Sequence, residues 1–172
     1  MDLRFITPQL RRLDLAGTEV LIACLVQGER PPHGVPGLAD WRLAGQISRL
    51  VQSGFATGEV GEVVLVPGKP KLPFDKILLF GIGPRDQFSE RVFRGVVQKM
   101  LRTLEGLRAR TAVVELPGRH IDAIAPDRAA DILLESAGGK QEHDVWTLVE
   151  PSSAQRLITQ HMIQERRRVR HG

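Results

Sequence analysis

Seven consecutive apolar residues, from Val20 to Val26, limit the folds open to this chain more than any other feature. A strand with one face in water alternates apolar and polar side chains, whereas an uninterrupted apolar run indicates a strand that is covered on both faces. The sequence therefore predicts a sheet that lies between two layers of helices. Cys24, the single cysteine, falls inside this run, so we expect a small buried hydrophobe rather than a reactive thiol.

The rest of the chain supplies further strands and the helices that would cover them. Alternating or β-branched residues predict strands at residues 2–6, 61–66, 75–80, 111–116 and 145–149. Apolar residues at three- and four-residue spacing predict helices at residues 38–52, 89–104, 126–137 and from 152 to about 162. Ser89 is expected to cap the second helix, and Ser152 with Gln155 forms a capping-box pattern at the start of the last.

Helices alternate with strands in the second half of the chain, and this order favours parallel strands joined by helical crossovers. We therefore expect an α/β fold of three layers, α/β/α, with a mixed and mostly parallel sheet of about six strands. A chain of 172 residues with 42% hydrophobic and 26% charged residues is ordinary for one globular domain.

The positive charge of the chain is concentrated at its C-terminal end. Lysine and arginine number 24 against 20 acidic residues, and four of the 24 are Arg166, Arg167, Arg168 and Arg170. We therefore divide the chain into a single domain at residues 1–165 and a basic C-terminal tail at residues 166–172. The first residues lack the apolar core of a signal peptide, and no stretch approaches the roughly 20 apolar residues of a membrane span. The expected location is the cytoplasm, without a membrane partner.

Gly81, Ile82 and Gly83 are the nearest approach to a nucleotide-binding turn, because they follow a predicted strand and precede a predicted helix. The third glycine position of the dinucleotide fingerprint is occupied by Asp86, whose charge would repel a pyrophosphate. Pro84 also removes one backbone N–H donor. A plain strand-to-helix turn is therefore the preferred interpretation, and phosphate binding is the alternative.

The residues offer no catalytic or metal-binding constellation. The five histidines are scattered, and none forms the two-histidine-plus-glutamate pattern of a zinc peptidase helix. His120 with Asp122 and His143 beside Asp144 are the closest pairs of histidine and carboxylate, and their loop positions indicate solvated side chains. No serine stands in a Gly-x-Ser-x-Gly turn. We nominate no catalytic residue, no metal ligand and no cofactor, and expect a protein that is not an enzyme.

A basic helix side together with the tail could follow a phosphate backbone. The residues that could contact an anion or a nucleic acid are Arg91, Arg94, Lys99, Arg102, Arg166, Arg167, Arg168 and Arg170. The simpler interpretation is a solvated helix face, because aromatic residues make up 5% of the chain and tyrosine is missing. Few side chains would then be available to stack on bases.

Two segments carry a resemblance to a known family. Residues 54–62, with the sequence Gly-Phe-Ala-Thr-Gly-Glu-Val-Gly-Glu, precede the strand 76–80, which runs into Gly81, Ile82 and Gly83. In this, the chain resembles the N-terminal domain of M17 leucyl aminopeptidases over residues 2–149. The resemblance implies a fold like that of macro domains. It also implies that the catalytic lysine, arginine and metal ions belong to a second domain, whose Asn-Thr-Asp-Ala-Glu-Gly-Arg motif does not occur here.

Three functions remain open on these grounds. The first is a non-catalytic interaction or assembly module, which binds itself or a protein partner, as the resemblance implies. The second is a nucleic-acid-binding protein that uses the tail and the basic helix side; some bacterial members of the family contact DNA. The third is a residual aminopeptidase activity or an ADP-ribose-related activity, although the phosphate loops of macro domains lack a clear match.

Overall fold

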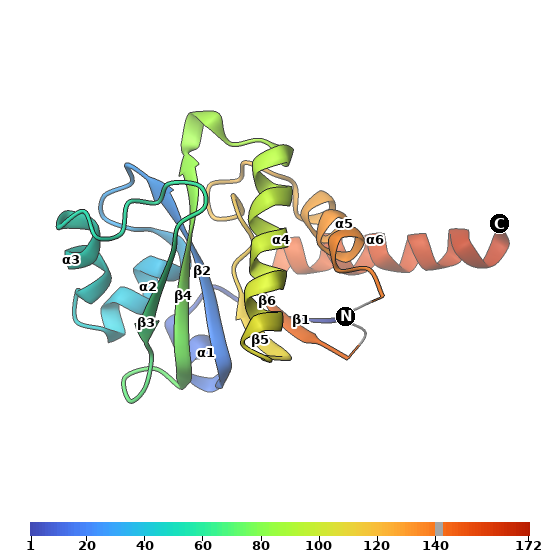
Figure 1. Cartoon of the computed structure of the whole chain (residues 1–172). Helices are drawn as coiled ribbons and strands as arrows, with labels where there is room; N and C mark the ends of the chain where they lie inside the picture. The colour runs from blue at the N-terminus through green and yellow to red at the C-terminus, as the bar shows by residue number, and fades with distance from the viewer. Residues whose placement is uncertain (140–142) are drawn as a thin grey trace.

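The computed structural model describes residues 1–139 and 143–172 and contains one mixed sheet with helices on both faces (Figure 1). The strands are β1 (Asp2–Ile6), β2 (Thr18–Gln27), β3 (Val63–Pro67), β4 (Phe74–Pro84), β5 (Thr111–Val114) and β6 (Val145–Val149). The helices are α1 (Leu10–Leu15), α2 (Gly34–Arg42), α3 (Gln46–Gln52), α4 (Glu90–Gly106), α5 (Pro126–Ala137) and α6 (Ser152–His171). The expected three-layer α/β architecture is confirmed.

The sheet has the order β1-β6-β5-β2-β4-β3, and β2 is one of its inner strands. β2 pairs in parallel with β4 on one side and with β5 on the other. Among the strands that the structure describes, only β3 runs antiparallel to its neighbour. Residues from Val20 to Leu25 are at most 3% exposed. The apolar run therefore forms the doubly covered strand that its composition predicts, and the sheet is mixed and mostly parallel as expected.

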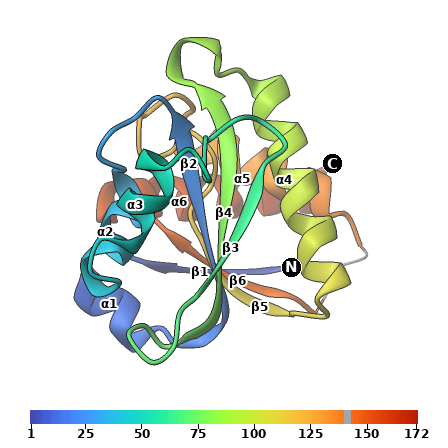
Figure 2. The ribbon, with the colours of Figure 1, turned by 60° about the vertical axis from the view of Figure 1, so that its left-hand side comes forward.

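The two faces of the sheet carry separate hydrophobic cores. On one face, β2 and β4 pack against α4 and α5, through residues such as Val97, Met100 and Ile132. On the other face, the cover comes from α1, α2 and α3, through Leu13, Val35 and Ile47. Figure 2 shows these two groups of helices on opposite sides of the strands. The two faces matter for the candidate site, because the chain that leaves each strand continues into a helix on one face or the other.

The predicted helix at residues 38–52 is wrong, since the structure breaks it into α2 and α3. Ala44 and Gly45 adopt φ angles of 53° and 81°, which lie outside the helical region. The Asp40 carboxylate then accepts the backbone N–H groups of Ile47 and Ser48 at 2.8 and 3.1 Å, so it caps the new helix from the preceding one. The spacing of Leu38, Trp41 and Ala44 predicts one buried stripe along a continuous helix, but Trp41 is 81% exposed.

Of the two helix caps that the sequence predicts, one is confirmed and one is wrong. The Ser89 hydroxyl accepts the N–H of Val92, so its predicted role at the start of α4 is confirmed. The capping box at Ser152 is wrong: no side chain caps α6, and Gln155 instead donates its amide to the carbonyl of Glu150. α6 continues to His171, so the basic tail is helical, while the division at residue 165 stays a prediction. No helix of the described ranges is long and apolar enough to span a membrane.

Candidate functional site

The carboxyl ends of β2 and β5 lie side by side at a topological switch point of the sheet. From β2 the chain enters α2 on one face, and from β5 it leads to α5 on the opposite face. In open α/β sheets the crevice at such a point is the usual place for a ligand, because two connections leave it in opposite directions. We therefore take this crevice as the candidate site.

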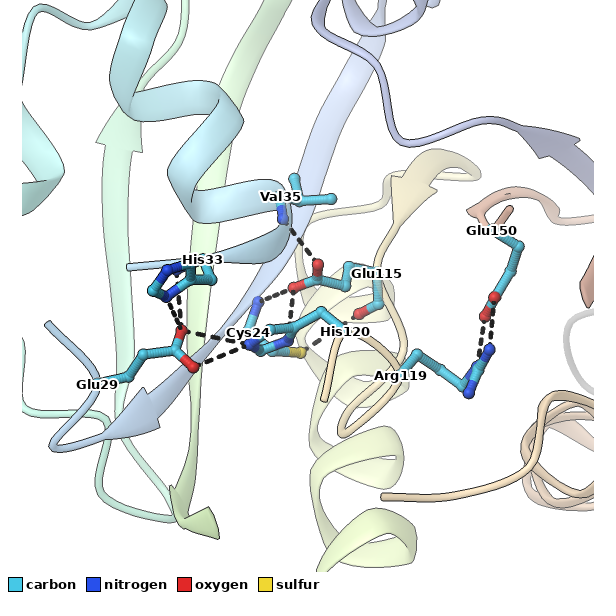
Figure 3. A network of polar contacts seen from close by, with 8 residues as sticks. All are labelled: Cys24, Glu29, His33, Val35, Glu115, Arg119, His120 and Glu150. Carbon is cyan, nitrogen blue, oxygen red and sulfur yellow. Dashed lines mark hydrogen bonds and ion pairs between the residues drawn. The ribbon is translucent and has the colours of Figure 1, made fainter. Parts of the chain in front are cut away.

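Glu115, which directly follows β5, fills the crevice with its own carboxylate. Its Oε1 accepts the N–H of Cys24 in β2 at 3.1 Å, and its Oε2 accepts the N–H of Val35 at 2.7 Å (Figure 3). Val35 lies in the first turn of α2, where backbone N–H groups have no partner inside the helix. The carboxylate thus takes the place at a helix N-terminus where many α/β proteins hold a ligand phosphate.

Burial gives this carboxyl group unusual acid–base properties. Glu115 is 3% exposed. Loss of solvation raises its pKa from 4.5 to about 7, while nearby His120 and the two backbone donors act in the opposite direction. Burial and the negative charge of Glu115 also raise the pKa of the Cys24 thiol well above its usual range. Cys24 is 1% exposed, as expected for a small core residue.

Gly34 allows the start of α2 to close over Glu115. Its φ is +66°, and a Cβ at this position would lie 2.5 Å from Oε2 of Glu115 and 2.8 Å from Cγ of His120. Both the left-handed backbone and the lack of space therefore require glycine. The close approach leaves no room for a ligand between the helix end and the carboxylate.

His120 joins Glu115 to Glu29 in the loop after β2. Its Nε2 lies 3.3 and 3.4 Å from the two carboxylate oxygens of Glu29, whose Oε1 also accepts the N–H of His33 at 2.9 Å. Its buried Nδ1 has no hydrogen-bond partner among residues 1–139 and 143–172, and it lies 3.9 Å from Oε1 of Glu115. The expectation of a solvated His120 is wrong, since 7% of its side chain is exposed.

A buried ion pair holds the loop between β5 and α5, in which His120 also lies. Arg119 donates Nε and Nη2 to the carboxylate of Glu150 at 2.8 and 3.0 Å (Figure 3). It also donates Nη1 to the carbonyl of Ile124 at 2.7 Å. Glu150 follows β6 as Glu115 follows β5, and it is 1% exposed. Two neighbouring strands therefore end in buried carboxylates, and both are satisfied by groups of this chain.

The Gly81–Gly83 segment lies within β4 rather than in a turn before a helix. A Cβ at Gly81 would collide with the carbonyl oxygen of Glu59, so this glycine lets the loop before β3 pack against β4. Neither Gly81 nor Gly83 opens a helix: α4 begins at Glu90, after a short 3-10 turn at Arg85–Gln87. The strand-to-helix turn expected at this position is thus displaced toward the C-terminus.

The basic residues nominated from the sequence fall into two groups, on α4 and on α6. Arg94 pairs with Glu135 at 3.3 Å, Lys99 donates to the carbonyl of Gly61, and Arg168 pairs with Glu165 at 3.1 Å. The others form no ion pair within residues 1–139 and 143–172; they are Arg91, Arg102, Arg166, Arg167 and Arg170. The helix α5 connects the two groups, since it packs against both α4 and α6. Contact of either group with a nucleic acid stays a prediction.

Metal-ligating side chains do not gather at the crevice. Across the ranges that the structure describes, no three His, Cys, Asp or Glu side chains are placed to hold one ion. The groups that sequence reasoning missed are Glu115, Glu150 and Glu29. A signal did exist for two of them, because Glu115 and Glu150 each stand at the end of a strongly apolar or β-branched run.

Comparison with known proteins places this fold in a family. The model of the cytosol aminopeptidase family N-terminal domain matches residues 26–139. The chain belongs to this family, through its N-terminal domain. A relative from Glaesserella parasuis, described as a probable cytosol aminopeptidase, is 30% identical over 103 residues. That match covers 58% of this chain and 21% of the relative, so the chain spans about a fifth of the relative's length. The predicted resemblance is thereby confirmed.

Solved structures support the fold of this aminopeptidase N-terminal domain. A variant of the Oceanobacillus iheyensis macrodomain with ADP-ribose superposes with a TM-score of 0.66 at 13% identity, covering 94% of this chain and 91% of that one. A variant of tomato leucine aminopeptidase gives a TM-score of 0.61 at 15% identity, covering 94% of this chain and 35% of that one. The macro-domain-like architecture is therefore confirmed, and the likeness shows the fold alone.

Proposed function

We propose that this chain is a non-catalytic interaction module that binds a protein partner or a second copy of itself through α6. The observation that carries the proposal is the closed crevice: Glu115 occupies the switch point and satisfies the donors there that a ligand would use. The ligand position common to this kind of sheet is thus filled by the protein itself. Function is then expected at the surface rather than at the strand ends.

α6 offers the surface for such contacts. Its first half packs through Ala154 and Ile158, which are at most 5% exposed, whereas its second half extends away from the rest of the chain (Figure 1). Three apolar side chains of α6 face water: Leu157, Ile163 and Val169 are 52%, 45% and 80% exposed. A helix that leaves apolar side chains and arginines exposed has the composition of a docking element, because arginine is enriched at interfaces and their buried centre is more apolar than the rest of the surface.

Affinity capture with the intact chain as bait tests this function. We expect stoichiometric recovery of a protein, or self-association in sedimentation, that survives nuclease treatment and is lost when Ile163 and Val169 are both replaced by aspartate. Leu15→Asp is the matched control, since Leu15 is 72% exposed on α1, away from α6. Recovery that is unaffected by the α6 changes, or no association by either method, would reject the proposal.

Nucleic-acid binding is the second candidate, favoured by the three arginines at 166, 167 and 170 that lack an ion pair among the described residues. It predicts recovery that nuclease abolishes and affinity that falls steeply with salt. A chain truncated after Glu165 would lose that affinity. The same capture experiment therefore separates the two candidates.

A further inference from the structure

A groove lies between the edge strand β1 and α6, outside the crevice described above. Its volume is about 470 Å³, and Phe5 of β1 forms one side of it. The other lining residues come from α6; they are Ser152, Gln155, Arg156, Thr159 and Gln160. The groove thus runs along the first half of the helix, beside the free edge of the sheet.

The free edge of β1 offers unpaired backbone groups to this groove. β1 pairs only with β6 in the described sheet. The N–H of Asp2 donates to Asp144, and the carbonyl of Ile6 accepts from Glu150, so these residues direct their backbone groups toward β6. Successive residues of a strand alternate in direction, and Leu3 and Phe5 therefore direct their N–H and C=O groups to the free edge. An edge of this kind accepts an extended chain as an added strand.

One arginine, Arg156, lies in the α6 lining of the groove, and further arginines follow along the same face of the helix. Arg156, Ile163 and Arg170 are separated by seven residues each, which places them on one face of a helix. Arg166 and Arg167 flank that face, and together with Ile163 and Arg170 they line a second, shallower hollow of about 240 Å³. From Arg156 to Arg170 this face is about 21 Å long at 1.5 Å per residue. None of its arginines has an ion pair within residues 1–139 and 143–172.

We propose that β1 and α6 form a docking groove for an extended, acidic segment of a protein partner, which adds to the edge of β1 beside the arginines of α6. The inference rests on the proposed function, since it names the partner and the surface of that same module. An extended peptide matches the unpaired groups of Leu3 and Phe5 with its own N–H and C=O groups. Glutamate or aspartate side chains on it reach the unpaired guanidinium groups, which bind carboxylates through paired donors.

A nucleic acid fits this groove less well. Its sugar–phosphate backbone has no N–H donors for the outward carbonyls of β1, and Phe5 is the single aromatic side chain in the lining. Stacking on several aromatic side chains is the usual way to hold single strands. The arginines alone would serve either partner, so the test must separate the backbone contacts from the charge.

The probe is a fluorescently labelled decapeptide that alternates glutamate and threonine, titrated with the intact chain and followed by anisotropy. Two matched probes carry the same charge: the same peptide with N-methyl groups on alternate residues, which cannot donate to β1, and a single-stranded oligonucleotide. The protein variant is the double change R156E/R167E, at two exposed side chains. Lys71→Glu in the loop between β3 and β4 is the control, because it reverses a charge at an exposed side chain near the opposite edge of the sheet.

We expect saturable binding of the glutamate peptide, loss of at least about tenfold in affinity for the double variant, and little change for Lys71→Glu. The N-methylated peptide should bind at least about tenfold more weakly, and the amides of Leu3 and Phe5 should gain protection from hydrogen exchange in the complex. Equal binding of the methylated peptide, tighter binding of the oligonucleotide, or no binding of the glutamate peptide would each contradict the proposed docking role of the groove. If partner capture still depended on Ile163 and Val169, the proposed interaction module would remain supported without the docking groove.

Discussion

Replacing Arg119 by methionine is expected to lower the free energy of unfolding by about 3 to 5 kcal/mol. The change leaves the Glu150 carboxylate 1% exposed and without the two donors that now lie 2.8 and 3.0 Å away. An uncompensated charge in the interior is costly because protein groups no longer replace its lost solvation. Urea unfolding, followed by the fluorescence of buried Trp146, measures the loss.

Two comparisons make this result specific. Changing Glu150 to leucine in the same chain should recover most of the loss, because the unpaired charge is then gone. Arg128→Met breaks a similar bidentate pair with Glu90, at 2.7 and 3.1 Å, on the surface of the protein. Solvent screens that pair, so its removal should have a much smaller effect. Equal effects of the two single changes would show that burial of the Arg119 pair does not matter.

Replacing Glu115 by alanine is expected to cost about 2 to 5 kcal/mol at mildly acidic pH. The change leaves the buried N–H groups of Cys24 and Val35 without an acceptor and opens a cavity at the start of α2. Glu115→Gln should not restore stability fully, because an amide has one acceptor oxygen and its NH₂ group would face one of the two N–H donors. Denaturant unfolding of the three proteins at one pH provides the comparison.

The pH dependence of the same variants tests the titration of Glu115. Its pKa is raised from 4.5 to about 7, so the folded protein binds this proton more tightly than the unfolded chain does. The resulting stabilisation is complete below pH 4.5 and is lost as the pH rises through about 7. The wild type should therefore lose up to about 3 kcal/mol relative to Glu115→Gln between pH 5 and pH 8. A constant difference between the two proteins across this range would show that Glu115 does not titrate there.

The elements that depend on local patterns could be predicted from the sequence. The run from Val20 to Val26 specifies a doubly covered strand because no polar residue in it could face water. The break between α2 and α3 could not be predicted in this way. The stripe from Leu38 to Val51 continues through it, and the new helix is capped by Asp40, a residue of the previous one. Hydrophobic periodicity indicates which face of a helix is buried, but it does not reveal a cap that a residue of another helix supplies.

The crevice could not be predicted from the sequence for a related reason. The partners of Glu115 in the crevice lie 91 and 80 residues away along the chain, so no spacing motif connects them. The sequence places His120 with Asp122 in a loop and therefore predicts a solvated side chain, whereas in the fold its contact is Glu29, 91 residues away. The useful signal was a glutamate at the carboxyl end of each of two apolar strands. The carboxyl ends of parallel strands meet at one edge of a sheet, and this places both glutamates at the edge that holds the crevice.

Titration of the isotope-labelled chain with ADP-ribose shows whether Glu115 closes the switch-point crevice to ligands. ADP-ribose is the suitable probe because a macrodomain with this fold was solved with it. Amide NMR spectra report on the N–H groups of Cys24 and Val35, which Glu115 occupies. Because Glu115 fills the crevice, we expect no saturable shift of these two signals at millimolar ADP-ribose. Saturable shifts centred on both would contradict it and would make the crevice a working nucleotide site.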